Sequence, residues 1–353
     1  APLLAAGTID IGKTAPSIIL PSLPGAPMLR HYAYSDLFLG YAIVCQKGFK
    51  TVADYEAEGM DIHEAVGAAV QQLVGKTFVM APEAGPAVLY NPAFKKGGIS
   101  LDDMEVIRVQ DAQGLALMKS GEGDCQLPGV PIRITLESLG MAPVVTSLDV
   151  ARVAEASLDS LELRAVSLNG WATTQGYWEK NRDTVLRMAS VGWRINDYIE
   201  EDLDRAIASH IPFVNQLAGT NLGPAEGQVV YTSLDPFYTF DGQAEWFQDQ
   251  SSIFLHTRLI DVQILALEES GEFPKGKYTY KDISIAEEVY QAMLGYKGDA
   301  EDAFRRLDRL GIRPGGDDLT TVEGAYAKAL QYHIWRDFLD AARFAEAALA
   351  AAN

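Results

Sequence analysis

The sequence predicts an α/β protein made of two similar lobes. Between residues 75 and 147, short β runs alternate with helical runs over short loops, which is typical of a parallel sheet covered by helices. The stretch GTIDIG (7–12) places a short strand between two glycines, and the stretch SGEGDCQLPG (120–129) repeats this order of glycine, acidic residue, strand and glycine loop. Two copies of one unit indicate two lobes, and loops at the carboxyl ends of strands bind ligands in open α/β sheets.

The composition limits the class of protein. A chain of 353 residues has room for two lobes, and its 48% hydrophobic and 22% charged residues are ordinary for a globular protein. The formal net charge of −19 argues against nucleic acid as a partner, because phosphate binding needs clustered lysine and arginine. An acidic, solvated surface is the simplest meaning of this charge.

The two cysteines, Cys45 and Cys125, are far apart in the sequence. Neither belongs to a C-x-x-C pair, which excludes zinc-ribbon and thioredoxin motifs. The simplest interpretation is two small buried residues in strands, and a long-range disulfide is the alternative. Such low cysteine usage fits the cytosol or the bacterial periplasm.

The chain shows neither a membrane span nor a signal peptide. No run reaches the roughly eighteen apolar residues that a transmembrane helix needs. No charged region followed by an apolar segment opens the sequence. Residues 1–7 instead resemble the last turns of a helix.

Hydrophobic periodicity predicts the elements of the first half. A strand is expected at 9–11 and a short helix at 16–23, with Thr14 or Ser17 as its N-cap. β-branched and aromatic runs predict strands, and apolar residues at helical spacing predict helices. On these grounds we expect strands at 28–34, 38–46, 76–80, 105–109, 123–126 and 143–147, and helices at 49–74, from 87, at 111–119 and at 131–139.

The second half is mainly helical. Alternation in LELRAVSL predicts a strand at 161–168 that leads back to the first lobe. A long apolar stripe predicts a helix that begins at Asp183, its N-cap, and includes Ile207. We then expect loops and short helices at 212–250, a helix at 253–267, a polar linker at 272–282, and helices from 283 onward with a turn at 311–318.

Four stretches, taken in order, resemble one family of proteins. They are AAGTIDIG (5–12), GAPM (25–28), LVGKTFVMAPEAG (73–85) and MKSGEGDC (118–125). Their order and spacing are similar to those of periplasmic solute-binding proteins of bacterial ABC transporters, of the nitrate, sulfonate, taurine and thiamine-precursor (NitT/TauT-like) type. The resemblance covers residues 1–210 and thins out beyond them.

The resemblance implies a type II periplasmic-binding-protein fold, in which hinge crossover strands join two lobes and ligand lies between them. It assigns 1–45 and 162–282 to lobe I, 46–161 to lobe II, and 283–353 to a C-terminal helical extension that packs on lobe I. The family has a strand, a helix and a second strand ahead of the position of Ala1. We therefore expect such a unit to precede Ala1 in the mature protein, because lobe I would otherwise contain a hole.

The resemblance also implies which loops line the cleft. Loops at strand ends and helix N-termini present unpaired backbone N–H groups, which hold a ligand without a charged side chain. For each loop, the alternative is an ordinary turn that does not touch a ligand. For Trp171, the alternative to stacking on a flat ligand is packing in the core. Glu83 either pairs with a cationic group of the ligand or faces solvent. The expected ligand-binding residues are Thr14, Ala15, Pro16, Ser17, Tyr34, Ser35, Glu83, Ala84, Gly85, Gln126, Pro128, Gly129 and Trp171.

Sequence patterns for catalysis are missing. The five histidines are scattered, with no H-E-x-x-H, and neither a G-x-S-x-G elbow nor a phosphate-binding loop occurs. We therefore expect ligand binding without a reaction, and neither a cofactor nor a metal.

The resemblance predicts a periplasmic solute-binding protein. It would capture a small polar or anionic molecule and deliver it to the membrane permease of an ABC importer, as a monomer. One alternative is an enzyme on the same scaffold, of the pyrimidine-precursor or menaquinone-pathway type, which would need a reactive histidine or cysteine at the cleft. The others are an interaction subunit that docks through the C-terminal helices, and a tripartite-transporter receptor.

Overall fold

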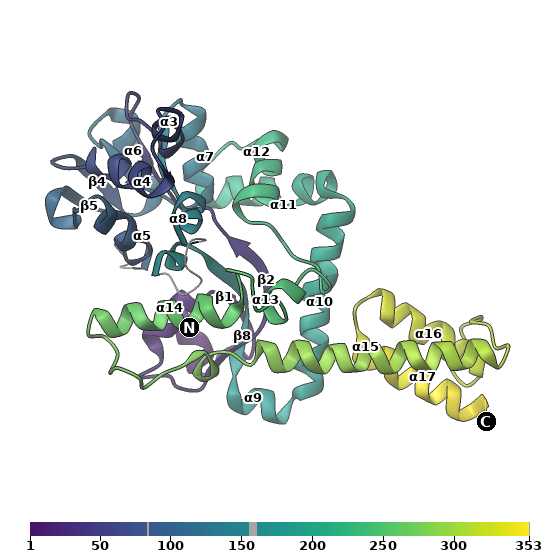
Figure 1. Cartoon of the computed structure of the whole chain (residues 1–353). Coiled ribbons are helices and arrows are strands. Elements are labelled where there is room, and N and C mark those ends of the chain that lie inside the picture. The colour runs from purple at the N-terminus through teal and green to yellow at the C-terminus, as the bar shows by residue number, and fades with distance from the viewer. Residues whose placement is uncertain (83–84, 155–160, 353) are drawn as a thin grey trace.

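The protein folds into two α/β lobes and a projecting helical arm (Figure 1). A computed structural model describes residues 1–82, 85–154 and 161–352. The first lobe is built on a sheet of three strands and the second lobe on a sheet of five. The C-terminal helices form the arm, which extends away from both sheets. The two-lobed α/β architecture predicted from the sequence is confirmed.

The five-stranded sheet has the order β5-β4-β6-β3-β7. β4 runs parallel to β5 and β6, whereas β3 runs antiparallel to β6 and β7. The central strands are apolar because helices cover both faces of such a sheet. Its strands are β3 (Ala42–Cys45), β4 (Thr77–Met80), β5 (Glu105–Arg108), β6 (Cys125–Leu127) and β7 (Ala142–Thr146).

The three-stranded sheet has the same antiparallel arrangement as strands β6, β3 and β7 of the larger sheet. Its order is β1-β8-β2, with β1 (Gly12–Thr14), β2 (Leu29–Phe38) and β8 (Ser167–Thr174). β8 is antiparallel to both neighbours, as β3 is between β6 and β7. The stretch 7–12 leads into β1 and the stretch 120–129 contains β6, so the repeated unit of the sequence belongs to equivalent strands.

Helices surround both sheets, and no helix among the described residues is both long and apolar enough to span a membrane. In the second lobe they are α3 (Val52–Ala57), α4 (Ile62–Gln71), α5 (Gly85–Lys96), α6 (Asp111–Ser120), α7 (Val130–Ser138) and α8 (Ser147–Ala154). In the first lobe they are α1 (Pro2–Ala5), α2 (Pro16–Ile19), α9 (Gln175–Lys180), α10 (Arg182–Glu201), α11 (Leu203–Ala218), α12 (Pro224–Val229), α13 (Ala244–Phe247) and α14 (His256–Glu269). The arm contains α15 (Ala286–Arg309), α16 (Val322–Ile334) and α17 (Phe338–Ala352).

Several boundaries differ from those predicted. The first strand lies at Gly12–Thr14 rather than at 9–11, because only this segment pairs with β8. Residues 161–165 form a short 3-10 helix, and the returning strand begins at Ser167, where pairing with β2 starts. Asp183 lies in the first turn of α10 rather than at its N-cap.

The long predicted helices are divided by capping side chains. The Asp202 carboxylate accepts the Arg205 N–H (3.1 Å) and starts α11, so the apolar stripe from 183 to 207 spans two helices. Thr51 and Asp61 each begin a capping box, which divides residues 49–74 into α3 and α4. α11 also continues into the region predicted as loops.

The chain crosses from the first lobe to the second at residues 39–41. β3 pairs only within the five-stranded sheet, so residues 42–45 belong to the second lobe, which corrects the predicted boundary. The Leu39 N–H donates to a first-lobe carbonyl, that of Leu234 (2.8 Å). Arg133 of α7 donates through Nη1 to the carbonyl oxygen of Gly40 (3.1 Å). Each lobe therefore holds one side of the bond between these residues, which makes it the natural pivot.

Cys45 and Cys125 form a disulfide in the core of the second lobe. The two residues are direct partners in the β3–β6 register, and both are completely buried. The prediction of two buried residues in strands is confirmed, and of the two alternatives the long-range disulfide is the one that the structure contains. The sequence could not reveal the pairing because it depends on the strand register.

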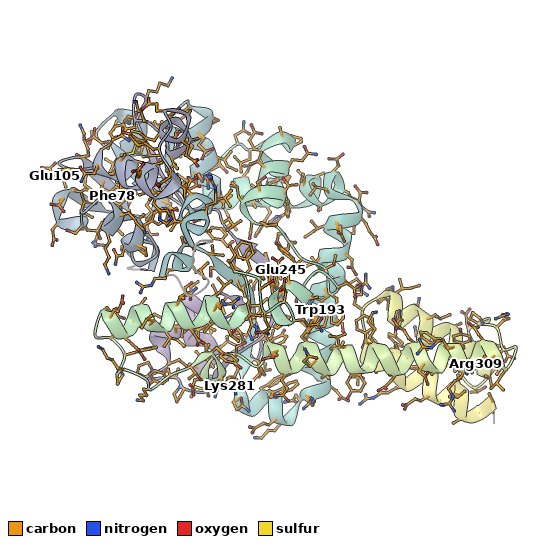
Figure 2. All side chains as sticks on the ribbon, in the orientation of Figure 1. Phe78, Glu105, Trp193, Glu245, Lys281 and Arg309 are labelled. Atoms are coloured by element: carbon orange, nitrogen blue, oxygen red, sulfur yellow. A yellow bond between two sulfur atoms is a disulfide. The ribbon has the colours of Figure 1, made fainter. Side chains whose placement is uncertain are left out.

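The C-terminal arm is anchored in the first lobe. Val289 and Tyr290, near the start of α15, belong to the first-lobe core, and Phe338 of α17 joins them. Farther out, residues such as Leu307 pack into a separate core between the three helices. Arg309, the last residue of α15, lies toward the far end of the arm (Figure 2).

Reduction of the disulfide should destabilise the protein. The pair has a sequence separation of 80 residues, and a cross-link over such a loop stabilises by about 2–4 kcal/mol, mainly by restricting the unfolded chain. Urea unfolding with and without reductant measures the effect. The C45A/C125A double variant is the control, because its midpoint should not respond to reductant. A wild-type midpoint that is unchanged by reductant would contradict the pairing.

The substitution Gly40→Ala should strain the crossing. A Cβ atom on Gly40 would lie 2.0 Å from Val130 Cγ2 and 2.9 Å from the Phe38 ring. We expect a loss of about 1–3 kcal/mol in the free energy of unfolding, as for other overpacked sites. Gly176→Ala in α9 is the matched control, since nothing lies within 4 Å of its Cβ position. Equal stability of the two variants in urea unfolding would refute the close packing at the pivot.

Candidate ligand-binding site

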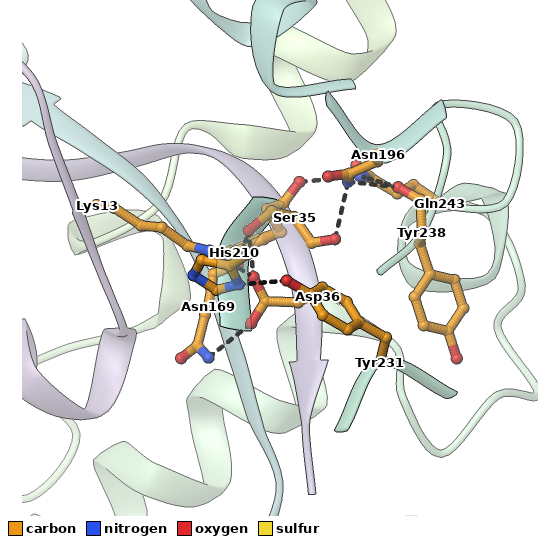
Figure 3. Close-up of polar contacts among 10 residues, drawn as sticks. Lys13, Ser35, Asp36, Asn169, Asn196, His210, Tyr231, Tyr238 and Gln243 are labelled. Atoms are coloured by element: carbon orange, nitrogen blue, oxygen red, sulfur yellow. Dashed lines mark hydrogen bonds and ion pairs between the residues drawn. The ribbon is translucent and has the colours of Figure 1, made fainter. Parts of the chain in front are cut away.

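A cluster of charged and polar side chains lies on the three-stranded sheet, beside the crossing. Lys13 comes from β1, Asp36 from β2 and Asn169 from β8. Asp235 approaches from the segment that follows α12. We call these four residues the polar cluster. Figure 3 shows Lys13, Asn169 and the nearby His210 gathered around Asp36.

An irregularity in β2 directs Asp36 into the polar cluster. The register of β2 against β8 shifts between Tyr34 and Asp36, which leaves Ser35 without a partner on β8. Asn196 of α10 donates to the Ser35 carbonyl (2.9 Å), and Gln243 donates to the Tyr34 carbonyl (2.9 Å). Buried amide side chains, together with the Tyr238 N–H that donates to the Ser35 carbonyl (3.1 Å), thus satisfy the backbone carbonyls at the bulge.

Asp36 is completely buried and accepts hydrogen bonds at both carboxylate oxygens. Lys13 Nζ lies 3.0 Å from Oδ1, and Asn169 Nδ2 donates to Oδ2 at 2.6 Å. The Ser35 hydroxyl also donates to Oδ1. Burial alone would raise the pKa of Asp36, but the charge of Lys13 and hydrogen bonds from Asp235 and Ser35 outweigh it, so the pKa is lowered.

Asp235 lies against Asp36, and its pKa is the raised one of the two. Burial and then the charge of Asp36 raise the pKa of Asp235 well above its usual range. The two carboxyl groups are hydrogen-bonded to each other, and Asp235 Oδ1 is buried without an N–H or hydroxyl donor. Two carboxylates in contact cannot both be ionised at modest cost. Asp235 is therefore the member of the pair that keeps its proton to higher pH, and Asp36 is the member that ionises first.

His210 and Tyr231 form an uncharged pair next to the polar cluster. Nδ1 of His210 is hydrogen-bonded to the Tyr231 hydroxyl (Figure 3). Burial and then the charge of Lys13 lower the pKa of His210, so its ring is neutral at pH 7. Burial and then the charge of Asp235 raise the pKa of Tyr231 to about 12. The pair therefore offers hydrogen bonds but no charge.

A groove of about 320 Å³ opens beside Asp235, between the two lobes. The second lobe contributes Gly129, Val130 and Pro131, at the start of α7, and Phe38 lies at the crossing. The first lobe contributes His210, Ile211, Val214, Leu222, Val230 and Asp235. Because its walls come from both lobes, the shape of this groove depends on their relative orientation.

Apolar residues next to the groove join the lobes. Val130 and Ile134 of α7 pack with Ile207 and Ile211 of α11 in one buried cluster, which also includes Tyr231. This contact holds α7 against the first lobe. The groove is therefore a continuation of the apolar interface between the lobes, with the polar cluster at one end.

The expected first-lobe ligand residues differ in their positions. Ser35 holds Asp36, so it lies next to the polar cluster. Residues 14–17 follow Lys13, and they run from the end of β1 into the first residues of α2. None of these four residues is among the described residues that line the groove. Of the expected second-lobe residues, 83 and 84 lie outside the described residues, and Gly85 is the first residue of α5.

Two aromatic residues expected at the ligand instead pack within the first lobe, Tyr34 fully buried and Trp171 half-buried against the core. Tyr34 lies inside β2, is 1% exposed, and its hydroxyl is hydrogen-bonded to Ser284 (2.9 Å). Trp171 lies within β8 rather than after the strand, and its indole packs against α10 at Gly192. Both residues lie inside strands because β2 continues to Phe38 and β8 spans Ser167–Thr174, whereas the predicted strands ended at 34 and 168.

The loop after β6 meets the expectation only in part. Gly129 borders the groove as the N-cap of α7, and its N–H donates to the Asp111 carboxylate (3.0 Å). Pro128 is buried beside it. Gln126 is also buried, and its Nε2 donates to the Asp111 carbonyl (3.3 Å), so this side chain is directed toward α6 and not toward a ligand.

The sequence reasoning missed the charged residues of the site. Asp36 stands alone among the apolar and aromatic residues of 32–38, and a lone charge in such a strand was the available signal. Asp235 and His210 had no comparable signal, because only the fold brings them beside β2. Across residues 1–82, 85–154 and 161–352, no three histidine, cysteine or acidic side chains are grouped to hold a metal ion.

No family model matches the chain, and no curated protein matches its sequence. Solved structures do share its fold. The putative periplasmic sulfonate-binding protein SsuA of Methylobacillus flagellatus is 13% identical, with 84% of this chain and 78% of that chain covered and a TM-score of 0.56. The periplasmic aliphatic sulphonate-binding protein SsuA of Escherichia coli is 15% identical, with coverages of 80% and 77% and a TM-score of 0.52. The desulfurization enzyme DSZB, in a mutant complex with biphenyl-2-sulfinic acid, is 12% identical, with coverages of 83% and 88% and a TM-score of 0.52.

The chain has the type II periplasmic-binding-protein fold. The structural matches confirm this fold, which the resemblance in the sequence predicted. They include binding proteins and an enzyme, so the scaffold alone does not assign an activity.

The substitution Asp235→Asn should change how stability depends on pH. In the folded protein Asp235 keeps a proton that the unfolded chain releases above about pH 4, so its contribution to stability falls as the pH rises toward its folded pKa. Asparagine donates a similar hydrogen bond at every pH. The stability of D235N relative to wild type should therefore rise with pH, by at most about 1.4 kcal/mol per unit.

Urea unfolding at several pH values from about 4 to 8 measures this difference. Asp204→Asn, at an exposed position of α11, controls for the loss of one carboxylate. Parallel curves for D235N and wild type would show that Asp235 is ionised in the folded protein.

Proposed function

We propose that this chain is an extracytoplasmic solute-binding protein that captures a small polar molecule between its lobes and delivers it to the permease of an ABC importer. The groove, with walls from both lobes, is the observation that carries the proposal. A ligand in such a groove contacts both lobes at once, so its binding favours one relative orientation of the lobes over the others. The crossing, which is held on each side by a different lobe, supplies a pivot for this change.

The disulfide favours the periplasm as the location. Disulfides persist in oxidising compartments such as the bacterial periplasm and are rare in the cytosol. Cys45 and Cys125 are paired, and both lie in the core of a lobe. The SsuA proteins that share the fold are periplasmic by name, which agrees with this proposal.

An enzyme is the second candidate, because DSZB shares the fold. Thiol chemistry is not open to this chain while its two cysteines are joined to each other. His210 borders the groove with a neutral ring, and it is the side chain that an enzyme would use as a general base there.

A thermal-shift screen tests the proposal. The panel contains sulfonates, nitrate, pyrimidines, riboflavin, polyamines and carboxylates, and a true ligand should stabilise the fold by about 2.7 kcal/mol at a hundred times its Kd. Mass spectrometry of the recovered ligand separates the candidates, since a receptor returns it unchanged and an enzyme returns product. A lack of stabilisation by every class, with stable binding to a protein partner instead, would contradict the proposal.

A further inference from the structure

The groove has apolar sides and one polar end. Its apolar side chains are Phe38, Val130, Ile211, Val214, Leu222 and Val230. The polar side chains, His210 and Asp235, come from the first lobe. A volume of about 320 Å³ suits a molecule with one ring or a short chain, since ligand pockets begin at roughly 300 Å³.

The positive groups near the groove are already occupied. Lys13 Nζ lies 3.0 Å from the Asp36 carboxylate and 5.2 Å from the centre of the Phe237 ring. At the start of α7, the Gly129 N–H donates to the Asp111 carboxylate (3.0 Å). Among the described residues that line the groove there is neither lysine nor arginine. An anionic head group would therefore meet Asp235, with neither lysine nor arginine in the described lining to offset its lost hydration.

We propose that the groove binds a small molecule with an apolar body and a primary ammonium head, and that the head donates hydrogen bonds to Asp235. This inference rests on the proposed ligand-binding function and names the ligand class for the same site. It assigns a head group of opposite charge to the sulfonates that the SsuA names specify. The net charge of −19 also favours the approach of cations to the molecule.

The contacts explain why an amine fits. An ammonium group has three donors and no acceptor, and Asp235 offers carboxyl oxygens at the polar end of the groove. His210 adds a neutral imidazole beside it. The apolar sides cover the rest of the molecule and exclude water, which strengthens the charged hydrogen bonds.

Three probes with one benzyl body test the head group. Benzylamine, benzyl alcohol and phenylmethanesulfonate are titrated separately, with isothermal calorimetry and thermal shift as readouts. We expect benzylamine to bind at least about tenfold more tightly than the other two, as a charge-assisted hydrogen bond implies. Equal or tighter binding of phenylmethanesulfonate would overturn the inference, and so would the absence of benzylamine binding.

Two variants locate the binding. D235N should weaken benzylamine binding by about tenfold to a hundredfold, because a bound ammonium favours the ionised form of Asp235, with release of its proton, and asparagine cannot supply that charge. V214W fills the groove and should abolish the binding of benzylamine without touching Asp235. Val191→Trp, at an exposed position of α10 that does not line the groove, is the matched control and should bind as wild type does. Benzylamine binding that persists unchanged in D235N or V214W would overturn the site.

The same experiments separate the proposed solute-binding function from the inference about the amine. If another class of the screening panel stabilises the protein and V214W abolishes that effect, solute binding stands and the amine class is wrong. If benzylamine binds as expected but is recovered as a product, the amine class stands and the receptor role is wrong.

Discussion

The buried carboxylate of Asp36 is the constraint on which the site depends. An ionised group without water is stable only when it is paired and hydrogen-bonded. Here the three strands of the first lobe meet this demand, since Lys13 on β1 and Asn169 on β8 both contact Asp36 on β2. Asp235 then adds a hydrogen bond from the segment after α12. The contacts of Asp36 therefore connect the three-stranded sheet with the first-lobe segments that form one wall of the groove.

The same constraint connects the site with the crossing between lobes. Asp36 faces the polar cluster because β2 bulges one residue earlier, and buried side chains on α10 and near α13 hold that bulge. Shortly after Asp36 the chain leaves the three-stranded sheet. In the second lobe, Arg133 of α7 donates a hydrogen bond to the carbonyl oxygen of Gly40. The bulge and the crossing thus lie within a few residues of each other, next to Phe38 of the groove. A change in lobe orientation must alter the groove, because α7 forms its opposite wall.

Local patterns in the sequence predicted much of the fold and little of the site. Strands with apolar runs, such as β4, and helices that end at a glycine, such as α6 before Gly121, lie close to their predicted positions. Their signals are local, since periodicity and turn residues act within a few positions. The predicted ligand residues rested on loops at strand ends. Of these, Gly129 borders the groove, whereas Tyr34 is buried in the core and Trp171 packs against it half-buried.

The sequence by itself determined the two-lobed α/β architecture, the repeated strand-and-loop unit and the acidic character of the protein. Tertiary structure decided that Cys45 meets Cys125 and that Asp235 reaches Asp36. The physical reason is the range of each effect. Hydrophobic periodicity is set within one element, but a disulfide or a pair of carboxyl groups in contact needs two distant segments in one register, which only the packed sheets supply.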